Sequence, residues 1–159
     1  MTKKTLADEL AAISAKSSAR GRALYDKLVK HLTESGAVEG ALKEGGEFPD
    51  FQLASAEGRF VRRADLLAHG PAVISFYRGA WCPYCSAELN ALAAIAPEIA
   101  AAGAALAAVT PEAGGAALRT KVDRKLEIEI LIDLDNVLAL ECGLMFPVPD
   151  DVRQAYMER

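Results

Sequence analysis

The feature that most constrains the fold is a short apolar run that leads directly into a closely spaced pair of cysteines. Residues 71–77 are almost entirely apolar, Cys82 and Cys85 follow, and apolar side chains then recur at helical spacing as far as Gly103. Such a run predicts a strand that is covered on both faces, which is typical of a parallel sheet. The strand should therefore deliver both cysteines to the N-terminus of a helix.

A helix N-terminus favours the ionised form of a cysteine. Its unpaired N–H groups and the positive end of the helix dipole stabilise a thiolate. A free thiol with a pKa near ~8.5 is ionised to only a few per cent at pH 7, and such a site lowers that pKa by about one to several units. The chemistry that the cysteine pair predicts is thiol redox.

Strand and helix patterns alternate from about residue 48 onward, which predicts a parallel-rich α/β sheet. We expect strands at residues 48–53, 59–61, 71–77, 104–109 and 128–132. We expect helices at residues 65–69, from the cysteines to Gly103, from Pro111 to about 125, and before Gly143.

Residues 1–40 are predicted to form a helical extension that precedes a domain at residues 47–159. Thr5 and Asp8 have the spacing of a capping box, and Ser17-Ser18 interrupts the apolar spacing of the extension. We therefore expect two helices or one kinked helix. The extension either folds onto its own domain or acts as an arm in a dimer.

Composition argues against several other classes of protein. The net charge of −4 favours neither nucleic acid nor an anionic membrane as a partner. Asp8 and Glu9 interrupt the apolar run that a secretory signal needs, and an odd number of cysteines does not suit a disulfide framework. We expect a cytoplasmic protein. Because two scattered histidines and one cysteine pair do not supply the about four ligands of a zinc site, we expect no metal and no cofactor.

Several motifs occur in an order and spacing that resemble one family. They are Phe48-Pro49-Asp50-Phe51, Gly70-Pro71 with Phe76-Tyr77, Cys85-x-x-Glu88-Leu89, Asp133-x-Asp135-Asn136, and Gly143-Leu144. Together they resemble the peroxiredoxin superfamily of the AhpC/TSA type, and the run from Arg78 to Cys85 is similar to a bacterial peroxiredoxin-like branch with the pattern RGxWCPYC. The resemblance implies an α/β, thioredoxin-like sandwich, here with an N-terminal helical extension and without the last two strands and the final helix.

The resemblance also implies a thiol-dependent peroxidase. Cys85 falls on the family's peroxidatic cysteine, Cys82 falls where the family has Thr or Ser, and Arg78 falls where it has Pro. Cys85 would attack hydrogen peroxide or an organic hydroperoxide and become a sulfenic acid, and Cys82 would resolve it to a disulfide. Thioredoxin or a similar dithiol would then reduce the disulfide.

Further residues near the cysteines are expected to support this chemistry. Arg78 is a candidate to stabilise the thiolate, Glu88 to accept hydrogen bonds on the first turn of the helix, and Arg153 and Arg159 are candidate peroxide donors only by proximity. The residues expected to shape the pocket are Tyr77, Trp81, Pro83 and Tyr84.

Two other functions remain open at this stage. Trp81-Cys82-x-x-Cys85 also resembles a thioredoxin active site, in which Cys82 would be the nucleophile of a thiol-disulfide oxidoreductase. A non-catalytic redox sensor or interaction subunit is the other possibility. Without the last two strands, the strand at residues 71–77 would be an apolar sheet edge, which predicts a homodimer, a fold-back of residues 146–159, or a piece of a longer chain.

Overall fold

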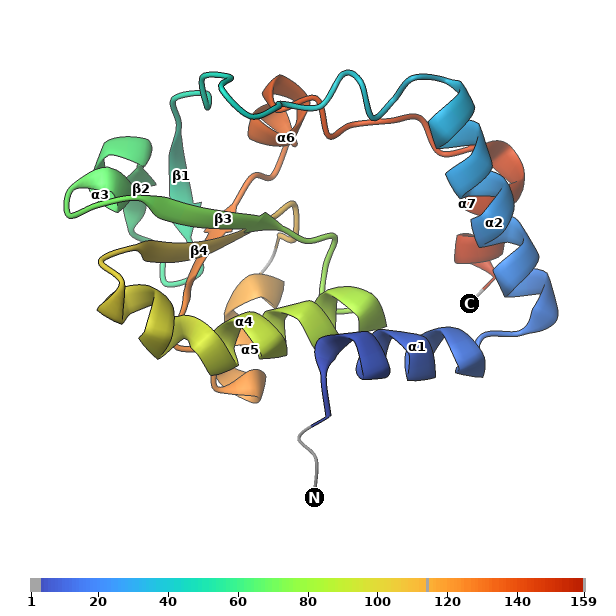
Figure 1. Cartoon of the computed structure of the whole chain (residues 1–159), viewed down its shortest axis with the longest axis horizontal. Coiled ribbons are helices and arrows are strands. Elements are labelled where there is room, and N and C mark those ends of the chain that lie inside the picture. The colour runs from blue at the N-terminus through green and yellow to red at the C-terminus, as the bar shows by residue number, and fades with distance from the viewer. Residues whose placement is uncertain (1–3, 114, 159) are drawn as a thin grey trace.

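The computed structural model describes residues 4–113 and 115–158, and its centre is a five-stranded sheet with the strand order β2-β1-β5-β4-β3 (Figure 1). The strands are β1 (Gln52–Ser55), β2 (Phe60–Arg62), β3 (Ala72–Phe76), β4 (Ala105–Thr110) and β5 (Glu129–Ile132). β3, β4 and β5 are parallel, and β1 runs antiparallel to both β5 and β2. The predicted parallel-rich α/β sheet is confirmed.

Helices cover both faces of this sheet, so the core has two layers. The helices are α1 (Leu6–Lys16), α2 (Ala19–Glu34), α3 (Arg63–Leu67), α4 (Pro83–Ala101), α5 (Ala116–Arg124), α6 (Val137–Glu141) and α7 (Asp150–Met157). On β4, Ala108 packs with Leu89 of α4, whereas Val109 packs with Leu138 of α6. Successive strand residues thus face opposite layers, as the two-residue period of a strand requires.

The N-terminal extension forms two helices that fold onto the rest of the chain. Thr5 and Asp8 make the predicted capping box, and the break falls at Ser17, where the backbone becomes extended. α1 packs against α4, and α2 packs against α7. Figure 1 shows α1, α2 and α7 displaced to one side of the sheet.

The start of β1 and the presence of α7 differ from the prediction. β1 begins at Gln52 rather than at residue 48, because Pro49 has no N–H to donate to a ladder and the first register pair joins Gln52 to Arg62. α7 was not predicted. Acidic Asp150 and Asp151 follow Pro149 at its first turn, and acidic residues there are favourable to the helix dipole.

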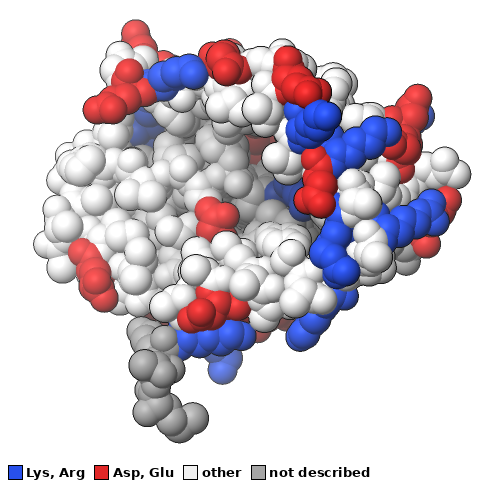
Figure 2. All heavy atoms as spheres, turned by 45° about the vertical axis from the view of Figure 1, so that its right-hand side comes forward, with Lys and Arg blue, Asp and Glu red and all other residues white. Residues whose placement is uncertain are grey.

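β3 forms one edge of the sheet, as expected, and β5 is the last strand among residues 4–113 and 115–158. Residues 150–157 do not pair with that edge but pack on α2. Between the sheet and α2 lies a cavity of about 860 Å³ whose lining includes Phe76, Trp81 and Tyr156. Figure 2 shows a hollow near the centre of its view, with most of the Lys and Arg, together with Asp and Glu, to its right and mostly uncharged residues to its left.

Candidate active site

Both cysteines lie at the start of α4, where the sequence predicts them. β3 ends at Phe76, and the loop that follows leads to Cys82, which is the N-cap residue of α4. Pro83 occupies the first turn of the helix, where its fixed φ angle suits the helix and its missing N–H costs nothing. Pro83 therefore sets the helix start that carries the two sulfurs.

Three donors converge on the sulfur of Cys82. Its Sγ accepts hydrogen bonds from the Cys85 backbone N–H at 3.3 Å, from the Cys85 thiol at 2.7 Å and from Arg78 Nη2 at 3.2 Å. Cys82 is fully buried, whereas Cys85 is partly exposed, and both are free thiols. This arrangement suits a negative charge on Cys82.

The pKa shifts of the two thiols run in opposite directions. Burial acts to raise the pKa of Cys82, but the hydrogen bonds from Cys85 and Arg78 outweigh it, so the pKa of Cys82 is lowered. The pKa of Cys85 is raised by burial and by the hydrogen bond to Cys82. The resting charge of the pair therefore belongs to Cys82, and attack by Cys85 stays a prediction.

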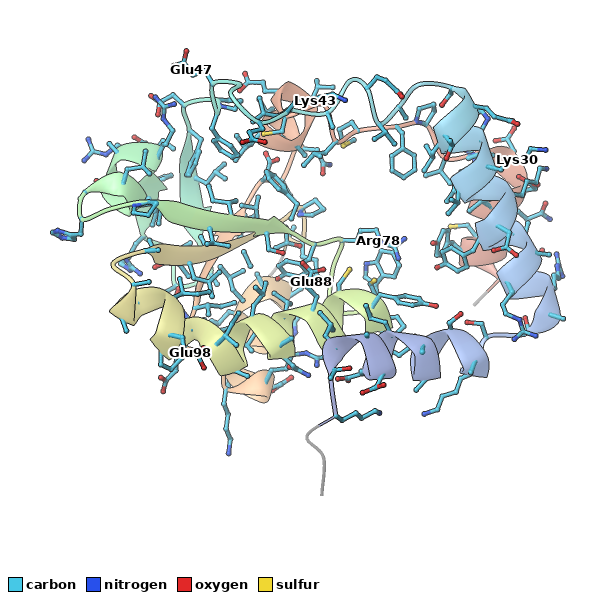
Figure 3. All side chains as sticks on the ribbon, in the orientation of Figure 1. Lys30, Lys43, Glu47, Arg78, Glu88 and Glu98 are labelled. Atoms are coloured by element: carbon cyan, nitrogen blue, oxygen red, sulfur yellow. The ribbon has the colours of Figure 1, made fainter. Side chains whose placement is uncertain are left out.

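Arg78 lies at the end of β3 on the side that faces α2 and α7 (Figure 3). Besides its contact with Cys82, its Nη1 donates to the hydroxyl of Tyr156 at 2.9 Å. The guanidinium carbon lies 4.9 Å from the centre of the Trp81 ring and 5.9 Å from that of Tyr156. The predicted thiolate partner is thus in contact with the sulfur pair and is flanked by two aromatic rings.

Aromatic side chains from three helices and the cysteine loop surround Arg78. The rings of Trp81 and Tyr156 meet edge to face at 5.8 Å, and Tyr25 of α2 contacts both Tyr84 at 6.4 Å and Tyr156 at 6.5 Å. Trp81 and Tyr84 were predicted to lie at the site. Tyr25 and Tyr156 were missed, because neither belongs to a recognisable motif and both lie far from the cysteines in sequence.

Glu112 holds the cysteine loop and was also missed. Its Oε1 accepts a hydrogen bond from the Ala80 backbone N–H at 3.0 Å. Gly79 between β3 and this loop has a φ of +151°, and a Cβ atom there would lie 2.6 Å from Trp81 Nε1 and 2.8 Å from Glu112 Oε1. The close approach requires glycine.

Two predicted residues lie close to the site in other roles. Glu88 Oε1 accepts from the Ser75 hydroxyl at 2.9 Å, so this carboxylate joins α4 to β3 rather than serving the first turn of the helix. Tyr77 is buried, and burial raises its pKa to about 12. Its backbone N–H donates to Val109 at 2.8 Å, which fixes the chain where it leaves the sheet.

The two C-terminal arginine candidates do not contribute a described contact to the cysteines. Arg153 is exposed and forms an ion pair with Asp150 at 2.9 Å. Arg159 lies outside the described residues.

A cleft of about 670 Å³ opens beside the sulfurs. Cys82, Cys85, Arg78 and Glu88 contribute its polar part. The remainder of its lining is apolar except for Tyr84 and comes from α1 and α4: Leu6, Leu10, Ala91, Leu92 and Ile95. The cleft provides room for a small substrate next to Cys85.

The part of the chain that the structure describes contains no group of three or more His, Cys, Asp or Glu side chains placed to hold a metal ion. Within the same residues, no helix is both long enough and apolar enough to cross a bilayer.

Comparison with known proteins places this geometry in context. The model of the AhpC/TSA family matches residues 45–157. The crystal structure of peroxidoxin BcpB from Mycobacterium tuberculosis is similar, with 26% identity, a TM-score of 0.62, and 64% of this chain and 66% of that chain covered. No curated protein sequence gave a significant match.

Two further structures share the fold at lower identity. Peroxiredoxin Q from Xanthomonas campestris has 21% identity and a TM-score of 0.57, with 60% of each chain covered. AhpC from Enterococcus faecalis has 17% identity and a TM-score of 0.56, with 62% of each chain covered. The match therefore spans less than two thirds of the length of each of these structures.

Proposed function

This chain belongs to the AhpC/TSA family, and from that premise we propose that it is a thiol peroxidase whose redox centre is the Cys82–Cys85 pair. The observation that carries the proposal is the convergence of three donors on Cys82 Sγ, with the Cys85 sulfur 2.7 Å away. That contact gives the pair a thiolate and a second thiol within reach of it. A peroxidase that passes through a sulfenic acid and a disulfide needs both.

The partial exposure of Cys85 supports it as the attacking residue. Cys82 has no accessible surface, whereas Cys85 is partly exposed and lines the cleft. Because the Cys85 thiol donates to Cys82, the buried thiolate is placed to take that proton as a general base. Cys85 becomes the nucleophile at the moment when a hydroperoxide lies beside it.

The proton that Cys82 takes from Cys85 is the only one that the proposed peroxidase step has to move. The Cys85 thiolate forms a bond to the terminal oxygen of the hydroperoxide, the O–O bond breaks, and the leaving alkoxide takes the proton back from Cys82 and departs as an alcohol. Cys85 is then a sulfenic acid and Cys82 is again a thiolate. Cys82 attacks the Cys85 sulfur, hydroxide leaves, and a disulfide forms.

An external dithiol, such as thioredoxin, would reduce this disulfide. Its thiolate attacks the Cys85 sulfur, which is the partly exposed one, and Cys82 leaves. A leaving thiol with a low pKa departs faster, so the lowered pKa of Cys82 favours this direction of attack. The second thiolate of the reductant then displaces Cys85 and restores the reduced pair.

The cleft supports hydrogen peroxide and organic hydroperoxides as substrates. Hydrogen peroxide needs only the polar floor at Cys85 and Arg78. An organic hydroperoxide would place its apolar group against Leu10 and Leu92, on facing helices, where burial of apolar surface favours binding.

A second candidate function is a thiol-disulfide oxidoreductase with Cys82 as the nucleophile. The lowered pKa of Cys82 at a helix N-cap favours it. The complete burial of its sulfur opposes it, because a protein disulfide must approach the attacking sulfur directly. A redox sensor or interaction subunit remains if neither thiol reacts faster than free cysteine.

Single Cys→Ser variants separate these functions. For the peroxidase, Cys85→Ser abolishes peroxide consumption, while Cys82→Ser forms a sulfenic acid that persists long enough to be trapped. Cys142→Ala is the matched control, since Cys142 lies in the core beside Leu138, and its peroxide consumption should be unchanged. A Cys82 mixed disulfide with an insulin-type substrate, without peroxide turnover, would favour the oxidoreductase instead.

We also propose that the chain forms a homodimer and works in the reducing cytoplasm. The unpaired edge at β3, where Val73 is 40% exposed, supports pairing with a second copy. The odd number of cysteines, three in all, does not suit a disulfide framework and fits a reducing compartment. Sedimentation equilibrium tests the dimer, and a monomer at all concentrations would contradict it.

A further inference from the structure

A continuous chain of hydrogen bonds links helix α2 to the sulfur of Cys82. The Tyr25 hydroxyl is 2.9 Å from the Tyr156 hydroxyl, Arg78 Nη1 donates to Tyr156 at 2.9 Å, and Arg78 Nη2 donates to Cys82 Sγ at 3.2 Å. Tyr156 accepts from Arg78, and either hydroxyl of the Tyr25–Tyr156 pair can donate to the other. Each hydroxyl thereby supports the next group along the chain.

We propose that the hydroxyl of Tyr156, supported by Tyr25, positions the Arg78 guanidinium on Cys82 and so sets the charge state of the cysteine pair. The inference deepens the proposed function, since the Cys82 thiolate is the base and resolving group there. Tyr156 touches neither sulfur in a described contact and acts through Arg78, so it is a positioning residue.

Arg78 needs an anchor because its side chain is long and exposed. An unanchored arginine samples many rotamers, and only some of them bring Nη2 to the sulfur. The planar guanidinium uses one edge for two partners at once, with Nη1 on Tyr156 and Nη2 on Cys82. The Trp81 and Tyr156 rings also flank the guanidinium and restrict its position. Ring contacts are less directional than a hydrogen bond, so they do not fix the orientation of the guanidinium toward the Cys82 sulfur.

The alternative is that Tyr156 only holds α7 on α2. Contacts remote from Arg78 serve that purpose as well: Lys27 pairs with Asp151, and Arg20 pairs with Glu158 at 3.5 Å. Lys27→Met therefore weakens the packing of α7 on α2 without touching the hydrogen-bond chain. It is the matched control for a role in packing alone.

The experiment follows the pKa of each thiol in the reduced full chain through the Cβ chemical shift of isotopically labelled cysteine, measured by NMR across a pH titration. Tyr156→Phe keeps the ring and removes the hydroxyl. The pKa of Cys82 should rise by about half a unit, because the guanidinium becomes less ordered but stays near the sulfur, whereas its complete removal costs about one unit. Tyr25→Phe should give a smaller rise in the same direction, and Lys27→Met should give none.

These outcomes decide the inference independently of peroxidase activity. An unchanged Cys82 pKa in Tyr156→Phe, or an equal rise in Lys27→Met, would refute the positioning role. Should Tyr156→Phe fail to fold, Tyr25→Phe alone decides, because its rise is expected only if the hydroxyl chain matters. A protein that consumes no peroxide but shows these shifts would overturn the proposed function and support this inference.

Discussion

Replacing Arg78 by methionine tests the electrostatics of the site most directly. Methionine keeps an unbranched apolar stem but removes the guanidinium, whose Nη2 lies 3.2 Å from Cys82 Sγ. The neutral thiol gains little from a nearby cation, whereas the thiolate is attracted to it. Arg78→Met should therefore raise the pKa of Cys82.

The size of the rise follows from the distance and the exposure. Two unit charges 3.2 Å apart attract by about 1.3 kcal/mol in bulk water and by about 5 kcal/mol at an effective dielectric constant near 20. Arg78 is exposed and Cys82 is buried, so solvent screening keeps the effect toward the lower value. A loss of about 1.4 kcal/mol is about one pKa unit. The contact is much shorter than the screening length of about 8 Å in physiological salt, so the effect should survive at that ionic strength.

The assay is the ultraviolet absorbance of the thiolate against pH, with the spectrum of the Cys82→Ser, Cys85→Ser double variant subtracted. Because the two thiols are coupled, the first apparent pKa describes the pair, and it should rise by about one unit in Arg78→Met. Arg78→Lys keeps the charge but cannot use one planar edge for both Cys82 and Tyr156. Its first apparent pKa should therefore lie between those of the unsubstituted protein and Arg78→Met. A first pKa that is the same in all three proteins would show that hydrogen bonds from Cys85 alone stabilise the thiolate.

Three further predictions concern the framework around the site. Burial raises the pKa of Tyr77 from 10.0 to about 12, so the tyrosine ionises at lower pH in the unfolded chain than in the folded one. The free energy of unfolding should therefore fall as pH rises from 10 through about 12. Measured by urea unfolding and compared with Tyr77→Phe, the fall should reach up to about 2.7 kcal/mol. Leu89→Ala replaces a side chain of α4 that is 1% exposed and should lower the free energy of unfolding by about 2–5 kcal/mol in the same assay; a loss below about 1 kcal/mol would contradict the packing described. Gly143→Ala should lower the melting temperature, because φ is +67° and a Cβ would lie 1.9 Å from the Gly40 carbonyl oxygen. The control Gly40→Ala should change it much less, because a Cβ there would lie at an ordinary 3.7 Å from the Ala37 carbonyl oxygen.

The sheet and the position of the cysteines could be predicted because both follow from local pattern. The apolar run at residues 71–77 and the helical spacing after Cys85 are short-range signals, and β3 and α4 lie where these signals place them. The start of β1 was less predictable, since a ladder depends on its partner strand as well as on its own residues. Helix α7 has acidic residues at its first turn, and this signal at residues 150–151 could have identified it.

The charge distribution within the site could not be predicted in the same way. Whether Cys82 or Cys85 holds the charge depends on the hydrogen-bond donors around each sulfur, and Arg78 is one of the donors at Cys82. Arg78 is anchored by Tyr156, which is 78 residues further along the chain. Tyr156 is in turn paired with Tyr25, across 131 residues. No local pattern carries information about a contact of that range, and only the packing of α2 on α7 brings these groups together.

The thiol at position 82 changes the electrostatics of a site in which the family has a hydroxyl. A hydroxyl is a far weaker acid than a thiol, so beside a cysteine it would remain a donor and leave the negative charge on the cysteine. A thiol at the helix N-cap, with Arg78 on one side, competes for that charge and takes it. In the proposed reaction, the first consequence is that Cys85 must give up its proton before it attacks, which slows the peroxide step. The second is that the proposed resolving thiolate already lies 2.7 Å from the Cys85 sulfur, which shortens the life of the sulfenic acid. The arrangement therefore favours protection of Cys85 from further oxidation over speed of the peroxide step. Both effects have one cause, because the hydrogen bonds that lower the pKa of Cys82 keep the negative charge on Cys82.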